Sequence, residues 1–153
     1  MSSDFDKMVD QLQQKILNDL KKVYSKEVIE LFQHPKNIGE IKGAEGYGKF
    51  TGPCGDTMEI FLRVRDNKIH DTKFMTDGCG TTLACGSTVT SLTKGKSIPE
   101  AMHITSNDIL NKLGGLPEAD VHCSVLAVNA LKKAIRNYLA EGKDSWKRFY
   151  KVR

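Results

Sequence analysis

The chain has 153 residues, a formal net charge of +4 and four cysteines. This length is that of one ordinary domain, which can bury a core without a disulfide or a metal. Acidic and basic residues are mixed along the chain, which argues against a dedicated nucleic-acid surface. No apolar run approaches the ~20 residues of a membrane span, and the N-terminus lacks the apolar segment of a signal peptide. We therefore expect a cytoplasmic protein in which the cysteines are thiols or ligands rather than disulfides.

The first 22 residues carry an apolar stripe with helical spacing. Its members are Phe5, Met8, Val9, Leu12, Ile16 and Leu20. They recur every three or four residues with polar residues between them, which predicts an amphipathic helix. We expect residues 1–22 to form an N-terminal extension whose stripe contacts either the core or a partner protein.

A second helix and a β-hairpin are expected next. Ser25 is a typical N-cap for a helix that Pro35 ends. Six glycines between residues 39 and 55 predict turns and short extended pieces rather than a helix. Residues 58–64 then alternate between apolar and polar side chains, as a strand with one buried face does. The pair Asp66 and Asn67 predicts a tight turn into a partner strand over residues 68–76.

Helices are expected over most of the remaining chain. The segment DGCGTTLACGSTVTSLTKGK, rich in small side chains, predicts a helix that ends at Gly95. Short helices are predicted around residues 99–102 and 106–113, and an apolar stripe over residues 127–138 predicts a long one. Helices, a small antiparallel sheet of about three strands, and more helices together predict the α+β class, with the helices packed on one sheet face. We assign residues 23–141 to this domain.

The last residues, 142–153, form a basic-aromatic segment. Trp146, Phe149 and Tyr150 have the spacing of one helix stripe and lie among five basic residues. Interleaved aromatic and basic side chains can bind single-stranded nucleic acid. The helical spacing instead favours a terminal helix that packs on the domain or on a partner protein.

Three of the four cysteines fall at predicted element ends. Cys54 precedes the first hairpin strand, Cys79 follows the hairpin, and Cys123 lies just before the last long helix. Helix N-termini favour a thiolate over a thiol, and glycines beside Cys54 and Cys79 leave room for an inorganic group. Asp56 can aim at the same point as Cys54, and His122 adjoins Cys123. These five residues are candidate metal ligands, the alternative being unrelated buried thiols and a turn aspartate.

Cys85 is expected to be separate from this set. Six residues after Cys79 on a helix, it lies about 9 Å along the axis and is rotated by about 240°. The two sulfurs therefore should neither form a disulfide nor share a metal. We predict that Cys85 is a buried small side chain.

Five motifs, in order over about residues 23–140, resemble the iron–sulfur cluster assembly scaffold family of the IscU and NifU N-terminal type. They are YSKEVIELFQHPKNIG, PCGD, DGCGTTLACGS, KGKSIPEA and LPEADVHCSVLAVNALKKAIRNY. The resemblance implies an IscU-like fold in which Cys54, Asp56, Cys79 and Cys123 hold a transient 2Fe–2S cluster, with His122 as a further metal ligand. Beside a thiolate, a carboxylate is a harder and more exchangeable ligand than another cysteine, which suits a cluster that is handed on.

The same resemblance implies several partners. A cysteine desulfurase would pass persulfide sulfur to the scaffold, and we expect Cys123 to accept it because of its helix-start position and neighbouring imidazole. Iron then binds among the ligands, a ferredoxin-like donor supplies electrons, and apo iron–sulfur proteins receive the cluster. The protein would be an assembly platform and carrier rather than an enzyme, and a homodimer is left open.

Three departures from the family pattern affect these expectations. The helix from Phe5 to Leu20 precedes the family's usual start and has no assigned role. Residues 116–120 read LPEAD where the family's chaperone motif is Leu-Pro-Pro-Val-Lys, so delivery through a specialised Hsp70-type chaperone is doubtful. Cys85 stands where small alanine or serine residues are usual.

One alternative is a zinc-binding sulfur acceptor or desulfurase regulator of the SufU type that builds no cluster, since zinc accepts the same ligands. That type normally carries an insertion between its second and third cysteines and lacks the histidine. The 44-residue spacing from Cys79 to Cys123 and the presence of His122 favour the scaffold.

Overall fold

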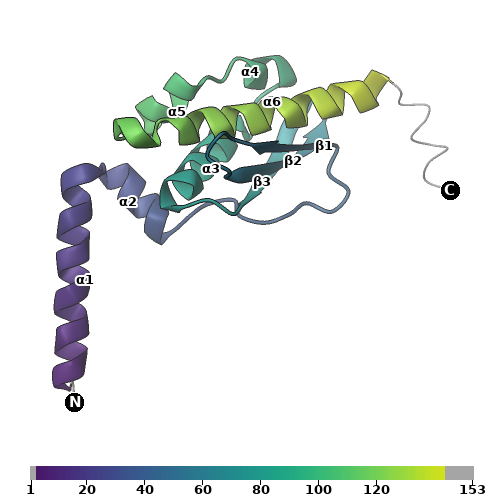
Figure 1. Ribbon diagram of the computed structural model, residues 1–153. Helices are drawn as coiled ribbons and strands as arrows, with labels where there is room; N and C mark the ends of the chain where they lie inside the picture. The colour runs from purple at the N-terminus through teal and green to yellow at the C-terminus, as the bar shows by residue number, and fades with distance from the viewer. Residues whose placement is uncertain (1–2, 144–153) are drawn as a thin grey trace.

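The computed structural model describes residues 3–143 and contains one three-stranded antiparallel sheet in the order β1-β2-β3 (Figure 1). The elements are α1 (Asp4–Val23), α2 (Lys26–Gln33), β1 (Gly46–Thr51), β2 (Thr57–Arg65), β3 (Lys68–Thr76), α3 (Gly80–Thr93), α4 (Ile98–Met102), α5 (Ser106–Leu113), the 3₁₀ turn η1 (Glu118–Asp120) and α6 (His122–Lys143). The helix predicted over residues 142–153 falls, from residue 144 onward, outside the described residues. Within them, no helix is both long and apolar enough to cross a membrane.

The helices cover one face of the sheet. Along β2, Met58, Ile60, Leu62 and Val64 are buried, while the residues between them are only partly covered. Helix α6 packs on β1 and β2, and α3 packs on β3 and α6 (Figure 1). The predicted α+β class, with a small antiparallel sheet and helices on one face, is confirmed.

Strand β1 is glycine-rich because α6 lies directly on it. A Cβ atom at Gly48 would lie 2.3 Å from the backbone nitrogen of Ala134, closer than any side chain tolerates. The sequence predicted only turns and short extended pieces for this glycine-rich segment. The segment contains the edge strand β1, which pairs with β2 from Gly46 to Thr51.

The hairpin between β2 and β3 follows the prediction. Asp66 and Asn67 both have positive φ angles, 53° and 64°. This is the backbone that the favoured two-residue hairpin turn needs, and Asn and Asp tolerate it better than most residues.

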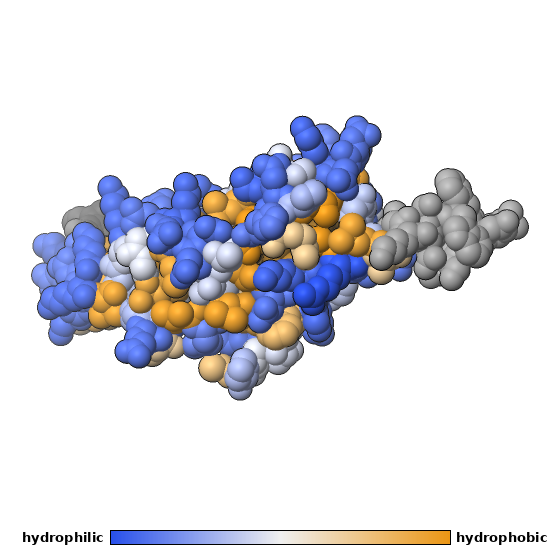
Figure 2. Space-filling model, turned by 90° about the horizontal axis from the view of Figure 1, so that it is seen from above, coloured by the Kyte–Doolittle hydropathy of each residue, from blue (hydrophilic) through white to orange (hydrophobic). Residues whose placement is uncertain are grey.

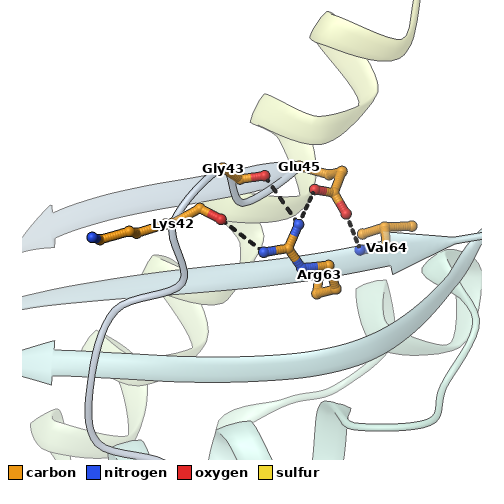
Figure 3. A network of polar contacts seen from close by, with 5 residues as sticks. All are labelled: Lys42, Gly43, Glu45, Arg63 and Val64. Atoms are coloured by element: carbon orange, nitrogen blue, oxygen red, sulfur yellow. Dashed lines mark hydrogen bonds and ion pairs between the residues drawn. The ribbon is translucent and has the colours of Figure 1, made fainter.

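A polar network fixes the segment that leads into β1 (Figure 3). The Arg63 guanidinium donates to the Glu45 carboxylate at 2.9 Å, to the Lys42 carbonyl at 2.7 Å and to the Gly43 carbonyl at 3.3 Å. The second Glu45 oxygen accepts from the Val64 N–H at 3.0 Å. The pairing of β2 and β3 is irregular between Arg63 and Val64, so Glu45 supplies an acceptor at the irregular position.

Helix α1 extends away from the rest of the molecule (Figure 1). It begins with a capping box in which Ser3 and Asp6 exchange hydrogen bonds, as helix N-termini favour. None of its residues is buried, and it packs mainly against α2. The predicted helix is present, and its stripe is not part of the core.

Seen from above, the face that carries α4, α5 and α6 shows apolar side chains interrupted by hydrophilic ones (Figure 2). Val125 and Leu139 are the exposed large apolar residues of α6.

Candidate metal-binding site

Three segments bring the candidate ligands together. Cys54 and Asp56 lie in the loop between β1 and β2, where the Gly52 N–H donates to the Asp56 carbonyl at 2.9 Å. Cys79 is the N-cap of α3, and Cys123 lies in the first turn of α6. Each ligand is thus held at the end of a regular element, where backbone groups remain free for other partners.

The Cys79 side chain is exposed at the start of α3 and makes no capping hydrogen bond to its own helix. Partial burial opposes ionisation of this thiol. The nearby backbone N–H groups of Thr82 and Thr81 favour the thiolate, outweigh that effect and lower the pKa of Cys79. The predicted preference for a thiolate at a helix start therefore applies here.

Cys123 differs because it is only 1% exposed. Burial raises the pKa of its thiol to about 11, although a hydrogen bond from Thr82 acts in the opposite direction. The expectation that a helix start would favour the thiolate is wrong for Cys123 in this conformation, because burial outweighs the helix end. The Nε2 atom of His122 lies 3.6 Å from the Cys123 sulfur.

Thr82 connects the three segments. Its hydroxyl oxygen lies 3.3 Å from Asp56 Oδ2, 3.5 Å from Cys123 Sγ and 3.8 Å from Cys79 Sγ, and the residue is fully buried. The sequence analysis missed this residue. The available signal was its position three residues after Cys79, which places it one helical turn into α3.

The site is assembled only in part. Asp56, Cys79 and Cys123 meet around Thr82, and His122 contacts Cys123, whereas Cys54 is exposed and lies outside these contacts. Within residues 3–143, no group of three or more His, Cys, Asp or Glu side chains is close enough to hold a metal ion. Thiolate, carboxylate and imidazole suit iron or zinc chemically. A metal would therefore need the ligands to close around it.

The comparisons decide the family. Residues 23–145 match the model of the NifU-like N terminal domain. The chain belongs to this NifU-like family. It is 46% identical over 117 residues, 76% of each chain, to the iron-sulfur cluster assembly scaffold protein IscU 1 of Archaeoglobus fulgidus.

Two solved structures share the fold of this NifU-like chain. The N-terminal NifU-like protein from Brucella abortus is 19% identical with a TM-score of 0.62, covering 80% of this chain and 98% of that one. A SUF-system scaffold protein from Fervidobacterium islandicum, described as putative, is 22% identical with a TM-score of 0.59, covering 73% and 96%. The predicted resemblance to the IscU and NifU type is confirmed.

Two further features of this NifU-like domain lie beside the ligands. Cys85 is fully buried, and burial raises the pKa of its thiol, so the prediction of a buried side chain is confirmed. The turn η1, which the sequence did not predict, precedes α6. There the Asp120 carboxylate accepts a hydrogen bond from the Tyr24 hydroxyl at 2.9 Å. This bond ties the segment before His122 to Tyr24, at the junction of α1 and α2.

Proposed function

We propose that this protein is a scaffold on which an iron–sulfur cluster is assembled from iron and sulfur and from which the cluster passes to apo-proteins. The observation that carries the proposal is the convergence of Asp56, Cys79 and Cys123 around the Thr82 hydroxyl. Membership of the NifU-like family and the similarity to an iron-sulfur cluster assembly scaffold protein support it.

The ligands divide into firm and exchangeable ones. The thiolates of Cys54, Cys79 and Cys123 are soft ligands that suit iron in a 2Fe–2S cluster, whereas the Asp56 carboxylate is a harder and more exchangeable ligand. Cys54 is exposed on the loop between β1 and β2 and would be the ligand that joins the other two thiolates when cargo binds. His122 is an additional nitrogen ligand next to Cys123.

Sulfur acceptance is assigned to Cys123. Its thiolate would attack the outer sulfur of a persulfide on a cysteine desulfurase, which breaks that S–S bond, releases the desulfurase thiolate and leaves a persulfide on Cys123. The proton of the thiol would pass to His122, whose Nε2 lies 3.6 Å away. A ferredoxin-like donor would then reduce the transferred sulfur to sulfide.

Cys79 is the competing acceptor because it is exposed and its pKa is lowered. Mass spectrometry of the Cys79→Ser and Cys123→Ser variants, each after one desulfurase turnover, shows which cysteine accepts the sulfur. Loss of the added sulfur mass only in Cys123→Ser supports Cys123. Loss only in Cys79→Ser would assign the acceptor to Cys79.

The scaffold function itself is tested by anaerobic reconstitution with iron and a cysteine desulfurase. Visible absorption and metal analysis should give a 2Fe–2S cluster that an apo-ferredoxin takes up. A protein that keeps only zinc and still accepts sulfur would instead be the zinc-binding sulfur acceptor.

The same assay tests the role of the carboxylate. Asp56→Ala should keep a bound cluster, because three thiolates and His122 remain, and transfer to apo-ferredoxin should be slower than from the parent protein. Transfer should be slower because an imidazole nitrogen, which suits iron better, would replace a hard oxygen ligand. Cys54→Ala, Cys79→Ala and Cys123→Ala should each lose the cluster. An Asp56→Ala protein that transfers faster than the parent would contradict this role.

Delivery is proposed to proceed without tight binding to a specialised Hsp70-type chaperone, because residues 116–120 read LPEAD. Titration calorimetry with such a chaperone should give no saturable binding. Micromolar binding that substitutions within residues 116–120 abolish would overturn this proposal.

A further inference from the structure

The apolar stripe of α1 is exposed along most of the helix. We define the α1 stripe as the regularly spaced positions Phe5, Met8, Leu12, Ile16, Leu20 and Val23, of which Leu20 is half-buried; Val9 and Leu17, also apolar and half-buried, lie beside it. Phe5, Met8, Leu12, Ile16 and Val23 expose between 51% and 67% of their surface. Because a helix with such a stripe normally buries it, an exposed stripe marks an interaction surface.

The spacing of the α1 stripe is symmetric about Gln14. Successive members are 3, 4, 4, 4 and 3 residues apart, so the pattern is the same in both chain directions. If a second α1 lies antiparallel and crosses at Gln14, every member of one stripe faces a member of the other. The facing pairs are Phe5 with Val23, Met8 with Leu20, and Leu12 with Ile16. A twofold interface requires this kind of self-complementarity.

The charges of α1 favour the same orientation. The first half carries Asp4, Asp6 and Asp10 with one lysine, and the second half carries Lys15, Lys21 and Lys22 with one aspartate. An antiparallel pair sets each acidic half beside a basic half. A parallel pair would set like charges beside one another.

We propose that α1 is a homodimerisation element that pairs antiparallel with α1 of a second copy of this chain. The helix extends away from the domain, so pairing leaves the candidate metal-binding site accessible (Figure 1). The matched family region begins at residue 23, so this element lies outside the part of the chain shared with the family model.

Sedimentation equilibrium of the full chain tests the proposal. The mass should rise with concentration from 17.0 kDa toward twice that value. Leu12→Asp combined with Ile16→Asp places charges at the centre of the interface and should give a monomer at all concentrations. The matched control is Leu139→Asp, which changes an exposed leucine of α6 and should dimerise like the parent.

Charge exchange tests the antiparallel orientation. Lys22→Glu should weaken the dimer, because residue 22 lies opposite Asp6 of the second copy. Asp6→Lys also removes the capping-box carboxylate, so the double variant Asp6→Lys with Lys22→Glu is compared with Asp6→Lys alone and should dimerise more tightly than it. A chain that stays monomeric would overturn the proposal. So would a double variant no tighter than Asp6→Lys, or α1-dependent binding of the monomer to phosphatidylcholine–phosphatidylserine vesicles.

Thr82 differs from three other buried threonines of α3, and this difference points to a role at the site. The hydroxyls of Thr88, Thr90 and Thr93 donate back to carbonyls of their own helix at 2.6–2.8 Å. The Thr82 hydroxyl instead contacts Asp56 of the β1–β2 loop and Cys123 of α6, as well as Cys79 at the start of its own helix. One hydroxyl has a single proton and two acceptor sites, so it can bridge several ligands but donate to only one at a time.

From these contacts we infer that Thr82 is a positioning residue, which holds Asp56, Cys79 and Cys123 together before cargo binds. This inference rests on the proposed function. Hydrogen bonds to ligands orient them, and losing such a bond typically weakens metal affinity by about 10- to 100-fold.

Cobalt binding to the apo-protein tests Thr82 without requiring cluster assembly. Thr82→Val keeps the shape but removes the hydroxyl, and it should bind Co²⁺ at least about tenfold more weakly, with altered thiolate-to-cobalt absorption bands. Thr82→Ser keeps the hydroxyl and should bind within a few-fold of the parent. Thr93→Val is the matched control, since it removes an equally buried hydroxyl that contacts only its own helix.

The outcomes separate the proposed scaffold function from the positioning role of Thr82. If the parent protein binds no cobalt, the metal site is wrong, and both the scaffold function and the role of Thr82 fail. If the parent binds cobalt and Thr82→Val binds it equally well with the same absorption bands, the positioning role alone is wrong. If Thr93→Val weakens binding as much as Thr82→Val, the effect is general destabilisation of α3 and the positioning role is also wrong.

Discussion

Helices α1 and α3 relate to the core in opposite ways. Helix α1 has a regular apolar stripe, yet none of its residues is buried. Helix α3 has no apolar stripe and is built largely from threonine, serine, glycine and alanine, yet ten of its 14 residues are buried. Small side chains allow α3 to approach the sheet closely, and the hydroxyls of Thr88, Thr90 and Thr93 are satisfied by carbonyls of their own helix. An apolar stripe therefore indicates a surface that needs a partner, whereas small residues indicate close packing.

The largest effect is expected where α3 approaches the sheet most closely. A Cβ atom at Gly86 would lie 2.4 Å from the Phe74 ring, which is itself fully buried. Helix propensity alone predicts that Gly86→Ala stabilises the protein by up to about 1 kcal/mol. Overpacking outweighs this, so we expect destabilisation by about 2–3 kcal/mol in urea unfolding. A more stable Gly86→Ala protein would show that α3 does not pack as closely as described.

A smaller effect is expected at Cys85, which is also fully buried in α3. Cys85→Ser places a hydroxyl in an apolar position and should destabilise the fold by about 1–2 kcal/mol. If the new hydroxyl donates to a helix carbonyl, as Thr88 does, the cost falls toward the lower value. Metal stoichiometry after reconstitution should be unchanged, because Cys85 is not among the ligands. A lower metal stoichiometry in Cys85→Ser than in the parent protein would place Cys85 in the site.

Local patterns in the sequence predicted much of this fold. Alternation over residues 58–64 predicted the core strand, and the Asp66–Asn67 pair predicted the hairpin turn. Both depend on neighbours within a few residues, so the sequence carries them directly. The candidate ligands were predicted in the same way, from cysteines and an aspartate next to element ends.

Features that depend on distant segments were missed. Gly48 is a strand residue only because α6 lies on it, and no local pattern contains α6. Cys123 has a raised pKa because the surrounding core covers it, although its helix-start position alone suggested the reverse. Thr82 contacts Asp56 and Cys123, which lie in segments that meet α3 only in the folded chain.

The smallest effect is expected in α1. Leu12→Gln combined with Ile16→Gln exchanges two large apolar side chains that expose 58% and 51% of their surface. Neither side chain belongs to the core, so in dilute solution, where the proposed dimer dissociates, the free energy of unfolding should change by less than about 0.5 kcal/mol.

The concentration dependence of Tm separates the parent from this variant. Dimerisation stabilises only the folded chain, so the parent's Tm should rise with protein concentration. The variant's Tm should not. The matched core change Leu62→Gln should cost several-fold more, because Leu62 is fully buried on β2. Thermal unfolding across a concentration series measures both quantities, and a large loss of stability in the dilute α1 variant would mean that the α1 stripe packs on its own domain.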